Sequence, residues 1–278
     1  MKDVAVLGLG LLGAGFAESL LEKGHKVRVW NRTAAKALPL REKGAVVAVD
    51  PATAVRGATH VHLVLAEDTA VDSVIAALRP GLGAGVPILD HSTNLPTRVA
   101  ARCKALRTEG VRYVSTPVFM GPANARAATG TMLVSGPKAE TEGVKSHLAA
   151  LTGTLVNVGE RDDLAAVFKL AGNSLFFALS GAAADVFSIG AGNGVDRDTM
   201  LQLFEHFVPS PALVAKRVAS SPTGPVNFDL TMARKDTRLM LEAAGSTPTM
   251  LLPAIAQAMD RALARGDGAR DYAIFANR

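Results

Sequence analysis

The stretch Val4-Ala5-Val6-Leu7-Gly8-Leu9-Gly10-Leu11-Leu12-Gly13 is an apolar run that breaks into glycines at positions 8, 10 and 13 and then continues as a helical pattern. It predicts a buried strand, a tight turn that requires glycine at position 8, and a helix packed close to the strand through Gly13. Gly10 leaves the backbone open to a pyrophosphate, and the start of the helix offers free N–H groups to it. A second apolar strand is expected at residues 26–30, which gives the turn the context of a dinucleotide site.

The turn after this second strand, Asn31-Arg32-Thr33, bears on the choice of cofactor. NAD sites usually place Asp or Glu about 20 residues past the glycines to bind the ribose 2′-hydroxyl, and residues 24–41 contain no acid. Arg32 instead offers a guanidinium group suited to a 2′-phosphate, and Asn31 and Thr33 add neutral hydrogen-bonding groups. These residues predict NADP(H) rather than NAD(H). A solvated loop arginine is the simpler alternative for Arg32.

The chain changes its pattern once. Up to residue 160, short apolar strands alternate with helical patterns, which predicts an α/β domain with a doubly wound parallel sheet. From residue 162 onward the pattern is helical. We therefore expect a dinucleotide-binding domain over residues 1–160 and an all-α domain over residues 161–278, joined by a long helix over residues 162–191. Strands are expected at 26–30, 46–49, 60–65, 87–90, 111–114, 132–135 and 154–158. Helices are expected at 33–43, 69–78 (with Thr69 as N-cap), from 96, and at 141–150, 196–207, 211–220, 230–244 and 248–265.

The long helix is apolar on nearly every side, which predicts that it is a buried core helix. Its uncharged window, Leu170–Ala184, is too short to span a bilayer. Lys169 and Asn173 stand out because they are four residues apart and share one face of the helix. A buried lysine needs a partner or a task, although a long lysine side chain also reaches solvent easily. From the helix alone, a functional and a structural role for Lys169 both stay open.

Composition sets the remaining expectations. The formal net charge of +5 favours binding of anions such as a phosphorylated cofactor or a carboxylate substrate. The basic residues are scattered and are not interleaved with aromatic residues, which argues against nucleic-acid binding. The single cysteine, Cys103, fits a reducing compartment, so we expect a cytoplasmic protein without membrane partners. We expect no metal site, and His62 in its apolar strand is interpreted as structural.

Taken together, these features resemble the β-hydroxyacid dehydrogenase family. That family includes 3-hydroxyisobutyrate dehydrogenases and glyoxylate or succinic semialdehyde reductases, with 6-phosphogluconate dehydrogenase and imine reductases as more distant relatives. The resemblance covers almost the whole chain. It rests on the glycine turn with Val29-Trp30-Asn31-Arg32-Thr33, on Asp90-His91-Ser92-Thr93, on Lys169 with Asn173, and on Phe228 with Lys235-Asp236.

The resemblance implies a Rossmann domain, NADP(H) as cofactor, a homodimer and a set of site residues. Lys169 is implied as the general acid or base that serves the carbonyl oxygen, with Asn173 as its partner. Burial of the lysine should lower its pKa towards the working range. The implied substrate residues are Ser92, Asn94, Phe119, Met120, Gly121, Phe228 and Asp236. The implied cofactor contacts beyond residues 8–13 and 31–33 are Leu65, Ala66, Val71, Thr93 and Lys235.

The chain departs from the family pattern at two places. The family usually carries P-V-S-G-G, and here the run is Pro117-Val118-Phe119-Met120-Gly121, so that an aromatic side chain replaces a serine and a methionine replaces a glycine. The position three residues after the lysine, often asparagine, is Gly172. Such a pocket loses polar groups and is expected to prefer a larger or more apolar substrate.

The residues and the resemblance predict an NADPH-dependent oxidoreductase that interconverts a small aldehyde or keto acid and the corresponding hydroxy acid. Phe119 and Met120 leave open an imine reductase-like enzyme, although imine reductases commonly place Asp or Tyr where this chain has Lys169. A dinucleotide-binding scaffold without turnover is a third interpretation, against which Lys169 and Lys235 argue.

Overall fold

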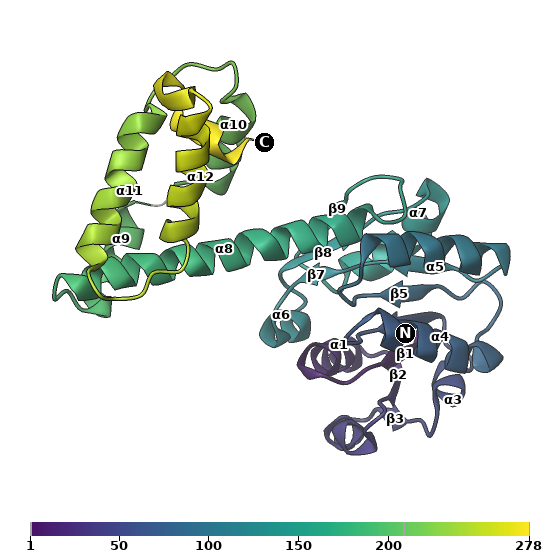
Figure 1. Cartoon of the computed structure of the whole chain (residues 1–278). Helices are drawn as coiled ribbons and strands as arrows, with labels where there is room; N and C mark the ends of the chain where they lie inside the picture. The colour runs from purple at the N-terminus through teal and green to yellow at the C-terminus, as the bar shows by residue number, and fades with distance from the viewer. Residues whose placement is uncertain (1, 208, 278) are drawn as a thin grey trace. The chain divides into compact units, whose positions relative to one another are not determined.

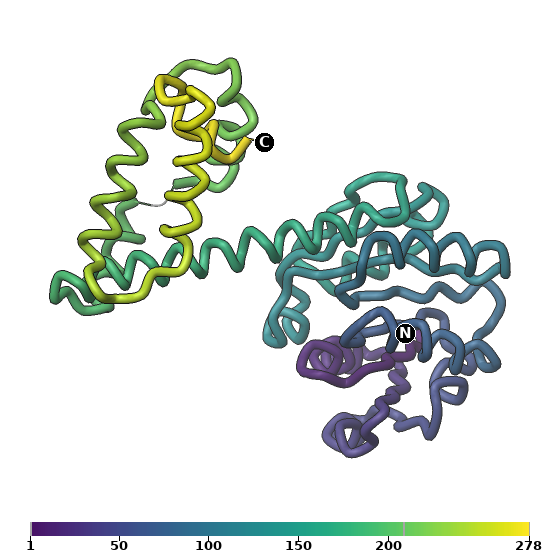
Figure 2. Tube along the Cα trace, viewed as in Figure 1, coloured from purple at the N-terminus to yellow at the C-terminus, as the bar shows by residue number. Residues whose placement is uncertain are grey.

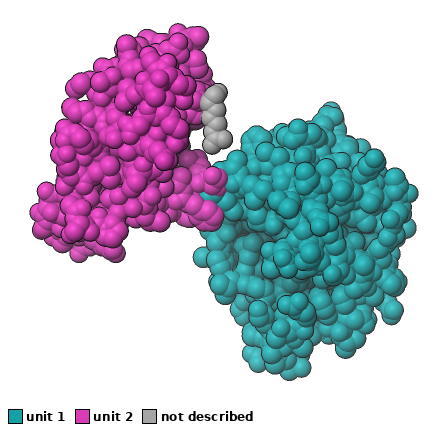
Figure 3. Space-filling model, viewed as in Figure 1, with its two compact units in different colours: residues 1–173 teal, residues 174–278 magenta. Residues whose placement is uncertain are grey.

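The computed structural model describes residues 2–207 and 209–277 (Figure 1). The chain divides into two compact units, residues 1–173 and 174–278, which Figure 3 shows in two colours. Figure 2 traces the backbone through both of them. The boundary lies inside the long helix α8 (Leu164–Gly192), whereas it was expected before that helix, at residue 160.

The first unit is built on a six-stranded parallel sheet, as predicted. Its strand order is β3-β2-β1-β4-β5-β6, so the chain starts at the centre, winds outward to one edge, and then returns to continue towards the other. The point between β1 and β4 where the winding direction changes is the place where ligands bind in such sheets. The strands are β1 (Asp3–Leu7), β2 (Lys26–Trp30), β3 (Val46–Val47), β4 (His60–Leu63), β5 (Ile88–Asp90) and β6 (Tyr113–Ser115).

Helices cover both faces of this sheet, which explains why its strands are apolar on both sides. Successive residues of β1 enter opposite layers, because Val4 and Val6 belong to one buried cluster and Ala5 and Leu7 to the other. The first layer contains α1 (Leu11–Glu22), α2 (Leu38–Glu42), α6 (Pro122–Ala127) and α7 (Lys138–Ala149). The second layer contains α3 (Pro51–Val55), α4 (Asp68–Leu78) and α5 (Pro96–Thr108).

Three further strands of the first unit form a separate small sheet. Strand β8 (Thr131–Val134) pairs antiparallel with β7 (Val118–Phe119) and parallel with β9 (Thr154–Asn157). The sequence pattern predicted β8 and β9 but not β7, which has only two residues. It could not show that these strands leave the main sheet, because hydrophobic alternation does not identify the partner of a strand.

The second unit is helical, as predicted. After α8 it contains α9 (Arg197–His206), α10 (Pro211–Ser220), α11 (Leu230–Ala244) and α12 (Leu252–Ala264), and short 3₁₀ turns at Asp267–Ala269 and Tyr272–Ala276. A small core of Leu230, Met259 and Ile274 joins α11, α12 and the last turn. The carboxylate of Asp185 on α8 accepts the N–H groups of Leu251 (2.8 Å) and Leu252 (2.8 Å), which fixes the start of α12 on α8.

The expectation that the long helix is buried is wrong for the single chain. Between residues 171 and 180 most side chains of α8 are exposed, including Phe176 and Phe177 at 67% each. The apolar pattern identifies a surface that avoids water. It does not show whether the covering surface comes from the same chain or from another molecule.

Several boundaries of helices and strands differ from expectation, and the starts of two helices show the reason. Residues 33–43 do not form one helix, because a 3₁₀ turn at Ala34–Ala37 precedes α2, which begins beside Pro39. Helix α4 begins at Asp68 with Glu67 as its N-cap, so Thr69 is not the cap.

Candidate active site

The glycine turn has the geometry that its sequence requires. Gly8 has φ +97°, and a Cβ atom there would lie 2.2 Å from the carbonyl oxygen of Val64. A Cβ atom on Gly13 would lie 1.9 Å from the carbonyl oxygen of Gly8. These two glycines let α1 pack against the strand ends at the centre of the sheet.

Gly10 keeps the opening of the turn free. A Cβ atom at this position would meet nothing within 4 Å, and Gly10 is the N-cap of α1 without a side-chain cap. The first backbone bond of the helix runs from Ala14 N–H to Gly10 O, so helix geometry leaves the N–H groups of residues 11–13 without acceptors in the helix. Open space beside free N–H groups and a helix N-terminus fits a pyrophosphate.

The second turn lies against the first. Asn31 accepts a hydrogen bond from Leu9 N–H (2.9 Å) through Oδ1 and donates to Thr33 O (3.0 Å) through Nδ2. This arrangement ties the turn after β2 to the glycine turn. Arg32 is exposed, and its side chain has no hydrogen bond or ion pair to any residue between 2–207 and 209–277. The Asn31 side chain therefore holds the turn in place, whereas the side chains of Arg32 and Thr33 are both exposed to a ligand.

The other predicted cofactor contacts of the first unit separate into accessible and inaccessible residues. Leu65 is half-buried, and Ala66 and Thr93 are exposed, on loops that follow β4 and β5. Val71 is fully buried in the core with Leu7, because its position on α4 turns it towards the sheet. Val71 is therefore not accessible to a cofactor in this conformation.

The side chain of Asp90, the last residue of β5, holds the loop that follows this strand. Its carboxylate accepts hydrogen bonds from Ser92 N–H (2.9 Å) and from Asn94 Nδ2 (2.8 Å). Ser92 Oγ accepts the N–H of Leu65 (2.9 Å), which links the loops that follow β5 and β4. Ser92 and Asn94 are both buried. Asn94 Oδ1 is buried without a hydrogen-bond partner among the described residues, and Ser92 keeps its hydroxyl hydrogen and one acceptor lone pair, so both side chains retain a group for a ligand.

Asp90 also belongs to a network of hydrogen bonds and ion pairs that was not predicted from the sequence. The hydroxyl of Tyr113 donates to Asp90 Oδ2 (2.6 Å) and accepts from Arg102 Nη1 (3.2 Å). Arg102 also forms ion pairs with Asp68 (2.9 Å) and Asp72 (2.6 Å) on α4. Burial raises the pKa of the Tyr113 hydroxyl well above its usual range, so it stays a hydrogen-bond donor. The one signal in the sequence was the pair of acids Asp68 and Asp72, four residues apart on one face of a helix.

Lys169 and Asn173 meet as predicted. Lys169 Nζ donates to Asn173 Oδ1 at 2.9 Å, one turn further along α8. Burial lowers the pKa of the Lys169 ammonium below its ordinary value of 10.5. An amine with a lowered pKa is suited to donate and to take up a proton.

The aromatic ring of Phe119 contacts the Lys169 ammonium, whereas Met120 packs elsewhere. Lys169 Nζ is 4.5 Å from the centre of the Phe119 ring, within the range of a cation–π interaction. Met120 packs on the core cluster beneath β8, with its Cγ close to Gly130. Gly121 is exposed and is the N-cap of α6. Of the two apolar replacements in this loop, only Phe119 faces the predicted acid or base.

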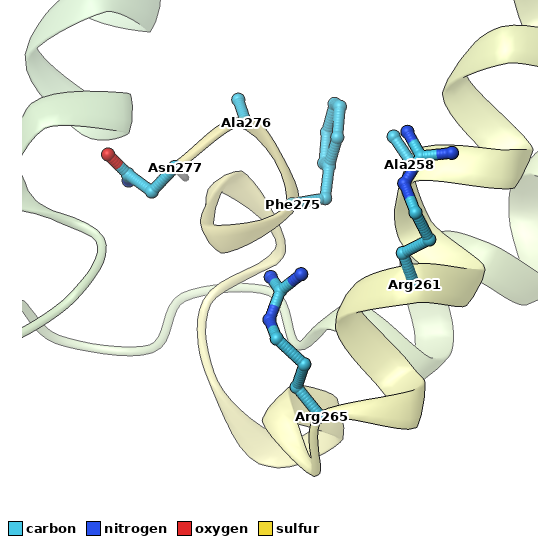
Figure 4. A pocket seen from close by; sticks show the side chains of 6 residues that line it. All are labelled: Ala258, Arg261, Arg265, Phe275, Ala276 and Asn277. Atoms are coloured by element: carbon cyan, nitrogen blue, oxygen red, sulfur yellow. The ribbon is translucent and has the colours of Figure 1, made fainter.

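Phe228, Lys235 and Asp236 belong to the second unit, where Lys235 Nζ lies 2.7 Å from Asp236 Oδ1. Their roles at the site stay predictions. The second unit also has a hollow between α12 and the last turn, where Figure 4 shows Arg261 and Arg265 near the Phe275 ring. Its lining includes none of the predicted site residues. No group of His, Cys, Asp and Glu among residues 2–207 and 209–277 is arranged to hold a metal ion.

Comparison with known proteins identifies the family. Residues 3–159, more than half of the chain, match the NAD binding domain of 6-phosphogluconate dehydrogenase. A 3-sulfolactaldehyde reductase of Escherichia coli is 26% identical, over 99% of this chain and 95% of its own. An NAD-dependent L-serine dehydrogenase of Pseudomonas aeruginosa is 27% identical, over 99% of this chain and 96% of its own. The chain belongs to the β-hydroxyacid dehydrogenase family.

This β-hydroxyacid dehydrogenase family member is therefore an NAD(P)-dependent dehydrogenase or reductase that acts on CH–OH groups. Its fold is shared with the structure of an imine reductase from Myxococcus stipitatus in complex with NADP+, with a TM-score of 0.88, 18% identity, and coverage of 99% of both chains. The glycine turn, with its open Gly10, fits the dinucleotide that the family uses.

Proposed function

We propose that this protein is an NADPH-dependent reductase that interconverts a small aldehyde or keto acid and the corresponding hydroxy acid. The observation that carries the proposal is the pair of Lys169 and Asn173, hydrogen-bonded at 2.9 Å on α8. The lowered pKa of the lysine adds to it. A scaffold without turnover has no need of a half-buried lysine with a lowered pKa.

The chain's own residues supply the proton chemistry. A bound nicotinamide supplies the hydride that adds to the carbonyl carbon. In reduction, the Lys169 ammonium donates a proton to the carbonyl oxygen and becomes a neutral amine; in oxidation, the neutral amine takes the proton from the hydroxyl group. Asn173 accepts one N–H of the ammonium and so fixes its direction.

The preference for NADPH rests on Arg32. Its exposed guanidinium is free to bind a 2′-phosphate in a bidentate manner, beside a turn that Asn31 holds in place. The relatives do not decide between the cofactors, since the L-serine dehydrogenase is NAD-dependent and the imine reductase structure contains NADP+. Arg32 is thus the feature of this chain that favours NADPH.

An imine reductase-like activity is the second candidate, and one observation favours it. The Phe119 ring on Lys169 makes the wall beside the lysine apolar, which suits a cyclic imine. A lysine as proton donor suits a carbonyl oxygen, and for that reason we place the aldehyde or keto acid first.

We further propose that the protein is a cytoplasmic homodimer. Helix α8 is long and apolar enough to cross a membrane by length and composition alone. It nevertheless carries Lys169 and Asp185, both engaged in hydrogen bonds within the two units. Covering by a second copy of the chain accounts for its exposed apolar side chains without burying these charges in lipid. Cys103 is buried, and burial raises the pKa of its thiol to about 12, so that it suits a reducing compartment as an inert thiol.

The proposal is tested by a substrate panel with NADPH that contains succinic semialdehyde, glyoxylate and a cyclic imine. We expect NADPH-dependent reduction of an aldehyde or keto acid, with kcat/KM above that for the imine. A higher kcat/KM for the cyclic imine would replace this proposal with the second candidate. NADPH binding without turnover of any of the three would favour the scaffold.

A further inference from the structure

Phe119 and Gly172 occupy the same space from two elements of the first unit. Phe119 ends β7, and Gly172 lies in α8. Figure 1 labels both elements. A Cβ atom on Gly172 would lie 2.3 Å from Cζ and 2.7 Å from Cε1 of the Phe119 ring. Carbon atoms do not approach so closely, so a side chain at residue 172 would require the Phe119 ring to move from this position.

The same ring touches the proposed acid or base. Lys169 and Gly172 are three residues apart and share a face of α8, and the ring lies against Gly172 with its centre 4.5 Å from Lys169 Nζ. An ammonium group has three N–H donors. Asn173 accepts one of them, and a second side of the ammonium faces the ring. The proposed role of Lys169 assigns the remaining N–H to the reacting oxygen.

This geometry determines what can lie beside the reacting carbon. Neither a phenyl ring nor a glycine without a side chain donates a side-chain hydrogen bond. A carboxylate placed against this wall would lose water without gaining a hydrogen bond from the ring or from Gly172, which is costly. An alkyl group placed there would be removed from water at a gain.

We propose that Phe119 and Gly172 form an interlocked pair that selects substrates with an apolar group, rather than a carboxylate, bonded to the reacting carbon. The inference rests on the proposed role of Lys169 and names the substrate class more narrowly. Semialdehydes whose carboxylate is separated from the carbonyl by methylene groups belong to this class, and 2-oxo acids do not.

A matched pair of inert ligands tests the selection without turnover. Isobutyramide and oxamate both present a carbonyl group, the first beside an isopropyl group and the second beside a carboxylate. Their dissociation constants for the protein saturated with NADPH are measured by calorimetry. We expect the unchanged chain to bind isobutyramide at least tenfold more tightly. Equal binding, or tighter binding of oxamate, would overturn the proposal.

Four chains then test the interlock: the unchanged chain, Phe119→Ser, Gly172→Asn and the double variant. We expect Gly172→Asn to displace the Phe119 ring and to lower the Tm more in the unchanged background than in the Phe119→Ser background, because the serine vacates the space. The double variant should reduce the isobutyramide preference at least tenfold. A loss of Tm that is the same in both backgrounds would contradict the interlock.

Phe168→Ser serves as the control, because it removes an aromatic ring from α8 at the residue next to Lys169. The ratio of the two dissociation constants should keep its original value in this variant. Selective binding of isobutyramide without any aldehyde turnover would reject the proposed function, and only the ligand preference of the Phe119 and Gly172 pair would stand. Aldehyde turnover without selective binding would support the proposed function and reject the inference.

Discussion

Lys169 is the residue on which the proposed chemistry depends. We expect Lys169→Ala to lower kcat for carbonyl reduction by roughly 10²–10⁴-fold, the usual contribution of a positioned acid or base. The dissociation constant of NADPH should stay the same. The matched control is Lys145→Ala, an exposed lysine on α7 whose partner is Glu142. Unchanged kcat in Lys169→Ala would mean that another group donates the proton.

The pH dependence of this step follows from the same lysine. Burial lowers the pKa of Lys169 below 10.5, and reduction requires the protonated form. The rate of reduction should therefore fall as the pH rises through the lowered pKa, and the rate of oxidation should rise over the same interval. Single-turnover rates in both directions across this range provide the measurement. Parallel pH profiles in the two directions would exclude Lys169 as the shared acid and base.

Arg32 is the residue that we expect to distinguish NADPH from NADH. Arg32→Ala removes the proposed contact to the 2′-phosphate, so we expect KM for NADPH to rise at least tenfold more than KM for NADH. Arg41→Ala, an exposed arginine of the neighbouring helix α2, should change neither constant. Equal increases for both cofactors would show that Arg32 does not distinguish them.

Individual residues also show the limits of prediction from sequence. Lys169 and Asn173 were predictable because a helix brings residues four apart together. The contact of Arg102 with Asp68 joins residues 34 apart, and the sheet topology alone brings them together. The sequence showed that Phe119 and Met120 depart from the family pattern, but not that one faces Lys169 while the other packs on the core.

At the scale of elements, strands β4 and β5 and helix α7 bring histidines together in the core of the first unit. His91 Nδ1 lies 2.9 Å from Thr116 O, a pure acceptor, so this nitrogen carries the proton. His91 Nε2 then accepts from His62 Nδ1 (2.8 Å), and His62 Nε2 accepts from His147 Nε2 (2.9 Å). In this assignment His62 and His91 each use one nitrogen as donor and the other as acceptor, which requires the neutral ring, and His147 donates from Nε2. The structural interpretation of His62 agrees with its full burial in this chain of bonds.

This histidine chain predicts a loss of stability in acid. Burial lowers the pKa of His147 to about 2, and burial likewise lowers the pKa values of His62 and His91. Below the unfolded value of about 6.5, the unfolded chain binds protons that the folded chain does not, so stability falls with the pH. Each histidine that stays neutral contributes about 1.4 kcal/mol per pH unit. Urea unfolding at pH 7.5 and 5.5 measures the difference.

Two variants test whether the hydrogen-bonded histidines cause this pH dependence. His147→Gln removes one titrating ring, so the unfolding free energy should change less between the two pH values, whatever its value at pH 7.5. His206→Gln on α9 removes an exposed histidine that is not one of the three hydrogen-bonded rings, and it should keep the original pH dependence. The same pH dependence in all three proteins would place the responsible groups elsewhere.

At the scale of the whole molecule, the alternation of strands and helices predicted the parallel sheet and the helical second unit. This was possible because the hydrophobic periodicity that distinguishes a strand from a helix lies within each element. The surroundings of α8 were not predictable in that way. Its apolar pattern matches that of a core helix, and yet Phe176 and Phe177 are each 67% exposed in the single chain. Fully burying a side chain of this size is worth about 1.5–3 kcal/mol, so an uncovered surface of this kind favours association.

We therefore expect a dimer of the chain at micromolar concentration by light scattering. The double variant Phe176→Asp/Phe177→Asp should shift the protein towards the monomer, because a carboxylate in a dry interface has no partner. Val49→Asp, at an apolar position that is 86% exposed in the first unit, should leave the dimer intact. A monomer for the unchanged chain would mean that α8 meets a different partner. A dimer that survives both aspartates would mean that the two copies meet at another surface, since two unpaired charges on α8 would oppose contact there.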